Sequence, residues 1–228
     1  MKIYDHELTL KEMDDILAQY PEANDLDFTG FDHNLDPISS KYLYAFMRDF
    51  KPNNVIEFGT SWGGSGKVIV DALSKNNQPF KYTGFEIVPE MKQNAEEQII
   101  PIKPDSVKIY DDVMQNLDKI PDGIDFAFID PNWDVIITKW WLNNLLPKLK
   151  DGALVQIHDW SVREVDGQLK YEGGDFAGIL YLIEKVNQKV FPFRKIFAVW
   201  DYPDYRGKWI ACSFWIYEKN KNKNIKYE

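Results

Sequence analysis

Three side chains that could bind a metal ion or accept a proton follow two apolar segments. Asp130 comes after the run 126–129, and His158 and Asp159 come after the run 153–157. If both runs are strands of one parallel sheet, their polar ends face the same crevice. Two carboxylates and an imidazole can hold Mg²⁺, Mn²⁺, Fe²⁺ or Zn²⁺. A neutral imidazole can instead take a proton from a hydroxyl, or His158 could simply bond the backbone, so its role stays open.

A second feature is a turn containing two glycines, between an apolar segment and a helical pattern. Residues 55–58 are typical of a buried strand, and Gly59 and Gly63 allow a sharp turn that approaches a ligand closely. Ser65 is predicted to cap the following helix. Unpaired N–H groups of such a turn face a crevice at the carboxyl end of the strand, where open α/β sheets bind ligands.

Acidic residues also follow the next two apolar segments. Glu86 follows the segment 82–85, where a carboxylate can accept hydrogen bonds from both ribose hydroxyls of a nucleoside. Asp111 and Asp112 follow the segment 107–110. We expect one of this pair to contact a ligand and the other to cap a short helix.

The elements that would position these residues alternate along the chain. Strands are expected over 55–58, 82–85, 107–110, 126–129 and 153–157, and helices over 66–74, 89–98, 136–149 and 176–190. This order predicts a parallel sheet with helices on both faces. Strands over 194–200 and 208–217 are joined by too short a connection for a crossover helix, so they should be antiparallel. The fold class is therefore α/β, a Rossmann-like doubly wound sheet of seven strands with an antiparallel last strand.

The chain reads as one domain with short additions at its ends. Residues 1–53 are expected to form a helical cap, beginning with a capping box at Thr9 and Glu12 and with Pro21 ending the first helix. A second helix should present Leu43 and Phe46 on one face. Residues 54–218 form the main domain, and 219–228 a basic, frayed tail. The segment 161–175 is expected to be a long loop beside the site.

The order Glu57-x-Gly59-x-x-x-Gly63-x-Ser65 resembles the first motif of class I S-adenosylmethionine (SAM) methyltransferases. It is particularly similar to small O-methyltransferases of the catechol O-methyltransferase type, and the resemblance covers residues 40–217. It implies that SAM is bound by Glu57, Gly59, Thr60, Ser61, Gly63, Ser65, Glu86, Ile87, Asp112 and Asp130.

The resemblance also bears on the metal. In the catechol-type family, the residue matching Asp130 is a Mg²⁺ ligand, and two further ligands, Asp-Asn, end the fifth strand. This chain has His158-Asp159 there, which implies Mg²⁺ or another divalent metal at Asp130, His158 and Asp159, the candidate catalytic residues. The family places a lysine base three residues after the strand-four acid, but this chain has Trp133. Deprotonation is therefore left to His158 or to a metal.

Composition limits the partners. Lys+Arg 27 minus Asp+Glu 36 gives a net charge of −9, which argues against nucleic acid or an anionic membrane as the partner. The single cysteine, Cys212, allows no intrachain disulfide and should be buried. No segment approaches the roughly 20 apolar residues of a membrane span. We expect a cytoplasmic protein that acts on a small molecule, and a homo-oligomer stays open.

The expected function is SAM-dependent methyl transfer to a hydroxyl of a small-molecule acceptor, assisted by a divalent metal. The alternatives are a metal-independent enzyme that uses His158 as base on an oxygen or nitrogen acceptor, and an inactive SAM-binding protein. A dinucleotide-dependent oxidoreductase would need G-x-G-x-x-G, but Ser61 stands where the second glycine would fall.

Overall fold

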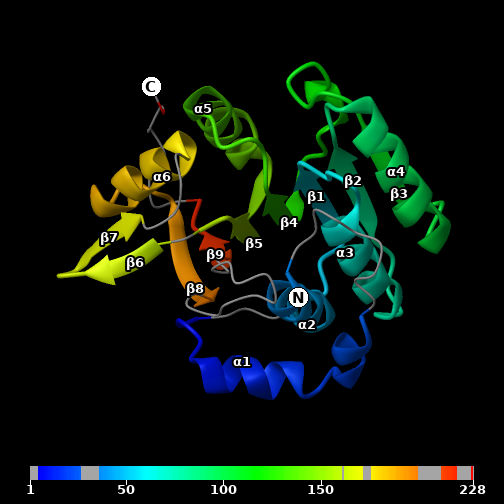
Figure 1. Cartoon of the computed structure of the whole chain (residues 1–228), viewed down its shortest axis with the longest axis horizontal. Coiled ribbons are helices and arrows are strands. Elements are labelled where there is room, and N and C mark those ends of the chain that lie inside the picture. The colour runs from blue at the N-terminus through cyan, green and yellow to red at the C-terminus, as the bar shows by residue number, and fades with distance from the viewer. Residues whose placement is uncertain are drawn as a thin grey trace.

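Strands of four to ten residues, each containing apolar side chains, form a central seven-stranded sheet, seen at the middle of Figure 1. The computed structural model describes residues 5–26, 36–160, 162–171, 176–199, 212–219 and 227. The strands are β1 (Asn54–Phe58), β2 (Lys81–Phe85), β3 (Val107–Tyr110), β4 (Ile124–Ile129), β5 (Leu149–His158), β8 (Phe193–Val199) and β9 (Cys212–Tyr217).

The strand order is β3-β2-β1-β4-β5-β9-β8, and β1 to β5 are parallel. Strand β9 runs antiparallel to both of its neighbours, β5 and β8. The predicted fold class is thus confirmed, with the reversed strand lying between β5 and the edge strand β8. The order reverses at β1, so the carboxyl ends of β1 and β4 flank the point where ligands bind in such sheets. The expected turn 201–207, and residues 200 and 208–211 of the expected strands, lie outside the described residues.

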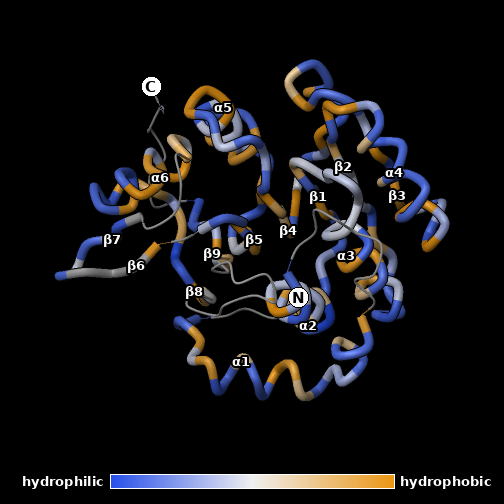
Figure 2. The backbone as a smooth tube through the Cα atoms, viewed as in Figure 1, coloured by the Kyte–Doolittle hydropathy of each residue, from blue (hydrophilic) through white to orange (hydrophobic). Residues whose placement is uncertain are grey.

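Helices cover both faces of the sheet (Figure 1). Helices α2 (Pro37–Phe50), α3 (Gly64–Ser74) and α4 (Pro89–Ile99) share one apolar cluster with the sheet. Helices α5 (Val135–Asn144) and α6 (Ala177–Asn187) share the other. Hydrophobic and hydrophilic segments alternate along the helices in Figure 2, as expected when one face of each packs on the sheet. Short 3₁₀ helices occur at Pro21–Asp25, Ile100–Ile102, Leu117–Lys119 and Leu146–Lys148.

Helix α1 (Leu10–Leu17) begins with the predicted capping box. The Thr9 hydroxyl accepts from the Glu12 N–H at 3.2 Å, and the Glu12 carboxylate accepts from the Thr9 N–H at 2.7 Å. The helix ends at Leu17, so the prediction that Pro21 terminates it is wrong; Pro21 instead begins a 3₁₀ helix, since proline fits the first helical position.

The expected loop 161–175 contains a β-hairpin, which corrects that prediction for residues 162–171. Strands β6 (Val162–Val165) and β7 (Gln168–Tyr171) pair antiparallel and project from the body of the molecule (Figure 1). The turn residues Asp166 and Gly167 both have positive φ angles, of 53° and 75°. An Asp-Gly pair favours this two-residue turn, so the sequence contained the signal.

The expected frayed tail is anchored near its end. Tyr227 is buried, its backbone exchanges two hydrogen bonds with the Asn143 side chain, and its hydroxyl donates to the Val190 carbonyl at 3.4 Å. The lysines at 221, 223 and 226 lie outside the described residues. Cys212 is buried in β9, as predicted.

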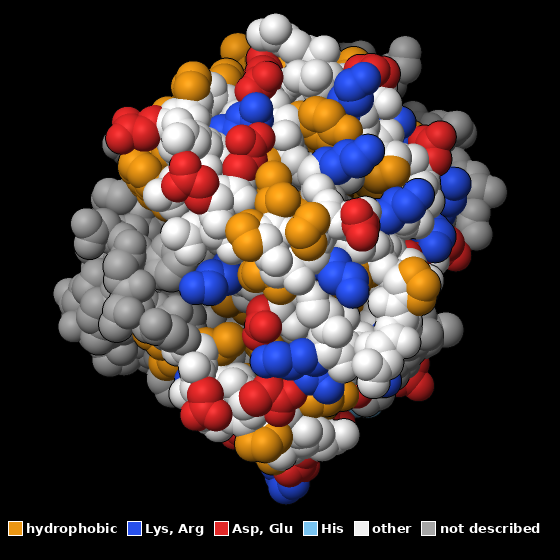
Figure 3. Space-filling view, turned by 90° about the vertical axis from the view of Figure 1, so that its right-hand side faces the viewer, with side chains coloured by type: hydrophobic (Ala, Val, Ile, Leu, Met, Phe, Trp, Pro, Cys, Tyr) orange, Lys and Arg blue, Asp and Glu red, His pale blue; other side chains and the backbone are white. Residues whose placement is uncertain are grey.

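The surface mixes charges of both signs. Basic and acidic side chains are interspersed with hydrophobic ones on the face shown in Figure 3. Among the described residues, no helix combines the length and apolar character that crossing a membrane requires.

Candidate active site

The turn after β1 is shaped by glycines that side chains could not replace. Gly59 has a φ of +91°, and a Cβ there would lie 2.2 Å from the Asp130 carbonyl oxygen. Gly63 has a φ of +92°, and its Cβ would lie 2.9 Å from the Ala95 Cα in α4. The turn therefore sits tightly between the loop after β4 and helix α4, as its glycine spacing predicted.

The predicted helix cap at Ser65 is wrong. Helix α3 begins at Gly64 with Gly63 as its cap, two residues before the predicted cap. The Ser65 hydroxyl instead donates to the Glu57 carboxylate, which also accepts from the Tyr82 hydroxyl. The buried carboxylate thus takes the hydroxyl that would otherwise cap the helix.

Glu57 is fully buried in β1 beneath the turn. Its burial raises the pKa of the carboxyl to about 7, although hydrogen bonds from Ser65 and Tyr82 act to lower it and the charges of Asp130 and Glu86 add to the rise. Glu57 in β1 therefore links this strand to β2 through Tyr82 and to α3 through Ser65. It does not line the cavity that opens at this edge of the sheet.

Glu86 is buried at the carboxyl end of β2 and faces the turn after β1. One carboxylate oxygen accepts from the Ser61 N–H at 2.7 Å, and the other from the Val88 N–H at 3.0 Å. Ser61 itself has a φ of +47°, an uncommon angle for a side chain that is not glycine. Each carboxylate oxygen retains a lone pair, so Glu86 can still accept hydrogen bonds from a ligand.

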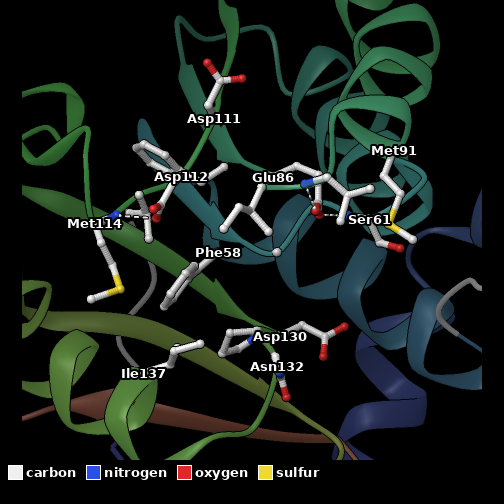
Figure 4. Close-up of a pocket in the computed structure, with 16 residues that line it drawn as sticks. Phe58, Ser61, Glu86, Met91, Asp111, Asp112, Met114, Asp130, Asn132 and Ile137 are labelled. Atoms are coloured by element: carbon white, nitrogen blue, oxygen red, sulfur yellow. Dashed lines mark hydrogen bonds between the residues drawn. The ribbon is translucent and has the colours of Figure 1, made fainter.

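A cavity of about 390 Å³ opens at this edge of the sheet (Figure 4). That volume falls in the usual range for small-molecule sites, about 300–1,000 Å³. Glu86 and Asp130 lie on opposite sides of it, and Asp112, which accepts from the Met114 N–H at 2.9 Å, lies at a third side. The lining residues are Phe58, Gly59, Ser61, Phe85, Glu86, Ile87, Val88, Met91, Asp111, Asp112, Val113, Met114, Asp130, Pro131, Asn132 and Ile137.

The structure divides the predicted ligand-binding residues into two groups. The cavity is lined by Gly59, Ser61, Glu86, Ile87, Asp112 and Asp130. The remaining four shape the turn from outside the cavity: Glu57, Thr60, Gly63 and Ser65.

Sequence reasoning predicted Ile87 but missed the rest of the apolar wall of this cavity. Val88, Met91 and Met114 line it, and Ile87, with 69% of its surface exposed, stands at its rim. The sequence did contain a signal for this wall. Apolar residues that follow directly after a buried strand and its terminal acid are costly to leave in water, so they indicate a ligand surface.

Asp130, His158 and Asp159 come together at the ends of β4 and β5, as predicted. The His158 Nδ1 lies 3.3 Å from the Asp130 Oδ2 and 3.4 Å from the Asp159 Oδ1. One ligand atom from each residue lies within 4.8 Å of the others. Asp130 belongs to this cluster and also lines the cavity, so it connects the cluster to the cavity.

The charges within this cluster shift the pKa values of His158 and Asp159 in opposite directions. Burial acts to lower the pKa of His158, but the carboxylates of Asp130 and Asp159 outweigh it and raise that pKa well above its usual value. Burial acts most strongly on Asp159 and would raise its pKa, but the charge of His158 and the hydrogen bond from Trp133 together outweigh burial and lower that pKa.

The cluster fits a divalent metal ion. The Nδ1 of His158 is buried, and no described residue gives it a hydrogen bond with good geometry. An imidazole nitrogen and two carboxylate oxygens that lie within 4.8 Å of one another are a donor set found in metal sites.

Three tryptophans, Trp62, Trp133 and Trp160, follow strands β1, β4 and β5. Trp133 and Trp160 are buried in the apolar cluster beneath α5 and α6, and Trp160 packs edge-on against Trp215. The Trp62 indole N–H is buried without a partner among the described residues. Packing therefore explains Trp133 and Trp160 better than direct contact with an acceptor.

Comparison with known proteins identifies a family that part of the chain resembles. Residues 56–160 match the model of a family described as a methyltransferase domain. Over these residues the chain is similar to a methyltransferase domain. The match includes the turn after β1, Glu86, and the cluster of Asp130, His158 and Asp159. It confirms the resemblance to methyltransferases and the enzyme class predicted from the sequence. No curated protein sequence matches the chain.

Solved structures share the fold of this methyltransferase domain. An O-methyltransferase from Bacillus cereus in complex with SAH (S-adenosylhomocysteine) has a TM-score of 0.65 at 16% identity, covering 92% of each chain. The O-methyltransferase TomG from Streptomyces achromogenes, in complex with SAM, has a TM-score of 0.63 at 15% identity, covering 89% of each chain. At these identities the likeness extends to the fold.

Proposed function

We propose that this protein is a SAM-dependent O-methyltransferase that acts on a hydroxyl of a small molecule and uses a divalent metal ion. The observation that carries the proposal is the position of Asp130, which belongs both to the 390 Å³ cavity and to the acidic cluster with His158. A cofactor in the cavity and an acceptor at the cluster would then meet at one carboxylate. Such placement of two reactants is the main task of the protein in methyl transfer.

The cavity suits an adenosyl cofactor. Glu86 offers carboxylate oxygens for the two ribose hydroxyls, and Asp112 lies on another wall where it can meet a base edge. Apolar side chains provide surfaces for the adenine ring, among them Phe85, Ile87 and Met114. Solved O-methyltransferases of the same fold contain SAM or SAH, which supports the same cofactor here.

Asp130, His158 and Asp159 would hold the metal. A bound divalent ion supplies a positive charge that orients the acceptor oxygen and lowers the pKa of its hydroxyl. The imidazole favours Mn²⁺, Fe²⁺ or Zn²⁺ over Mg²⁺, which prefers oxygen ligands alone. We therefore propose a transition metal at this site in preference to Mg²⁺.

His158 as a general base is the second candidate, and the geometry is less favourable to it. A base must be neutral before it accepts a proton. Two carboxylates within 3.4 Å of the Nδ1 stabilise the charged imidazolium instead. A bound metal ion would remove this conflict, because its positive charge would balance Asp130 and Asp159 while the His158 imidazole stays neutral.

Calorimetric titration of SAH into the parent protein and the Glu86→Ala variant tests the proposal. We expect the variant to bind SAH at least about tenfold more weakly, because a hydrogen bond to a charged group contributes about 1.5–3 kcal/mol. Glu90→Ala, which removes an exposed acid at the start of α4, is the control and should bind like the parent. A parent protein that binds neither SAH nor SAM would refute the proposal.

A panel of hydroxyl and amine acceptors, assayed with and without a chelator, separates the alternatives. The proposal expects transfer to a hydroxyl that the chelator abolishes and added Mn²⁺ restores. Transfer that the chelator leaves unchanged would instead support a metal-independent reaction.

A further inference from the structure

Trp133 connects the loop after β4 to the end of β5. Its side chain is buried, with 3% of its surface exposed, and its indole N–H donates to the Asp159 Oδ2 at 3.2 Å. Asp130 precedes it by three residues in the same loop. The hydrogen bond therefore spans the two strand ends that supply the carboxylates of the cluster.

The backbone of Trp133 is fixed from the other side by α6. Its carbonyl accepts from the Gly178 N–H at 2.9 Å. A Cβ on Gly178 would lie 2.3 Å from the Thr138 Oγ1 and 3.0 Å from the Trp133 carbonyl oxygen, so this helix approaches as closely as a glycine permits. The indole is thus held in place between α6 and Asp159.

Asp159 needs such a contact. Its φ of +55° places it in the left-handed region, which is unfavourable for residues other than glycine and which the surroundings must maintain. Its two oxygens have different neighbours, since Oδ2 accepts from Trp133 and Oδ1 lies near the His158 Nδ1. The indole therefore determines which oxygen of Asp159 faces the metal position.

We propose that Trp133 is a positioning residue of the metal site, which sets the orientation of the Asp159 carboxylate relative to Asp130. This inference rests on the proposed function, because it presumes a metal at the cluster. An indole N–H only donates hydrogen bonds, so Trp133 cannot remove the acceptor proton itself. Its contribution is to the affinity and geometry of the metal site.

Binding of Mn²⁺ to the protein, measured by electron paramagnetic resonance, tests the inference with Trp133→Phe. We expect the variant to bind Mn²⁺ about 10–100-fold more weakly, the effect typical of losing a hydrogen bond to a metal ligand. SAH affinity should stay within about twofold of the parent. Trp141→Phe is the matched control, since Trp141 is also buried but its indole N–H has no partner in the described part of the chain; it should bind Mn²⁺ like the parent.

A second variant, Gly178→Ala, covers the case in which Trp133→Phe does not fold. Its Cβ would clash with the Thr138 Oγ1 at 2.3 Å and press on the Trp133 carbonyl at 3.0 Å, which would loosen the contact of α6 with Trp133, so it too should weaken Mn²⁺ binding while SAH binding persists. Parent-like Mn²⁺ affinity in either folded variant would overturn the inference and leave the proposed function intact. A parent protein that binds SAH but no Mn²⁺ would overturn both this inference and the proposed metal.

Discussion

At the scale of single residues, the strand-end acids were predictable and their partners were not. Glu86, Asp130 and Asp159 could be found because each follows an apolar run, and the ends of parallel strands share one edge. The contacts of Glu57 with Tyr82, 25 residues away, and of Trp133 with Asp159, 26 residues away, depend on how the strands pack. No spacing in the sequence encodes such distances.

Glu57 predicts a pH dependence of stability. Its pKa is raised to about 7 in the folded protein, above its usual value of 4.5, so the folded state binds this proton more tightly than the unfolded state. The stability that it contributes is complete below about pH 4.5 and is lost as the pH rises through 7. The loss amounts to about 3 kcal/mol at most.

Urea unfolding of the parent and Glu57→Gln between pH 4.5 and 7.5 measures this effect. We expect the difference in unfolding free energy, parent minus variant, to fall as the pH rises, because glutamine does not titrate. Exposed Glu90→Gln should leave the pH profile of the parent unchanged. Parallel profiles for the parent and Glu57→Gln would show that Glu57 has an ordinary pKa.

At the scale of elements, the period of the apolar residues predicted the strands well, and it located turns less well. Residues 162–171 form a hairpin where a loop was predicted, although the pair Asp166-Gly167 favours a two-residue hairpin turn. The start of α3 was misplaced because Ser65 fits a helix cap by type, whereas the structure gives its hydroxyl to Glu57. Local preference is overridden when a buried carboxylate needs a donor.

The turn after β1 should not tolerate a side chain at Gly59. Gly59→Ala places a Cβ 2.2 Å from the Asp130 carbonyl and adds the strain of a positive φ. We expect a loss of about 3 kcal/mol or more in unfolding free energy, measured by urea titration, together with loss of SAH binding.

Gly152→Ala is a control that introduces the backbone strain of a positive φ without a steric clash. Gly152 has a φ of +80°, but a Cβ there would meet nothing within 4 Å. We expect Gly152→Ala to lower the free energy of unfolding by about 1–2 kcal/mol and to leave SAH affinity unchanged. If Gly59→Ala behaves like this control, the tight packing of the turn against Asp130 is not required.

At the scale of the whole molecule, the alternation of strands and helices was sufficient to predict the sheet and its reversed strand. It could not predict that Tyr227 docks on the body, because this docking combines burial of its side chain with two hydrogen bonds between its backbone and the Asn143 side chain. These contacts tie Tyr227 to the end of α5. That helix follows the loop carrying Asp130 and Trp133.

Tyr227→Ala should therefore destabilise the protein by about 2–4 kcal/mol, the usual effect of truncating a buried large side chain. Tyr227→Phe, which removes only a long hydroxyl contact of 3.4 Å, should cost less than about 1 kcal/mol. Thermal or urea unfolding measures both. Equal stability of Tyr227→Ala and the parent would show that the tail is not anchored in solution.

A crystal structure of the protein grown with SAH and Mn²⁺, with anomalous diffraction recorded for manganese, tests the central claim most directly. We expect the nucleoside in the cavity, with its ribose on Glu86, and an anomalous peak bound by Asp130, His158 and Asp159. SAH bound elsewhere, or a cavity that stays empty at saturating SAH, would contradict the claim.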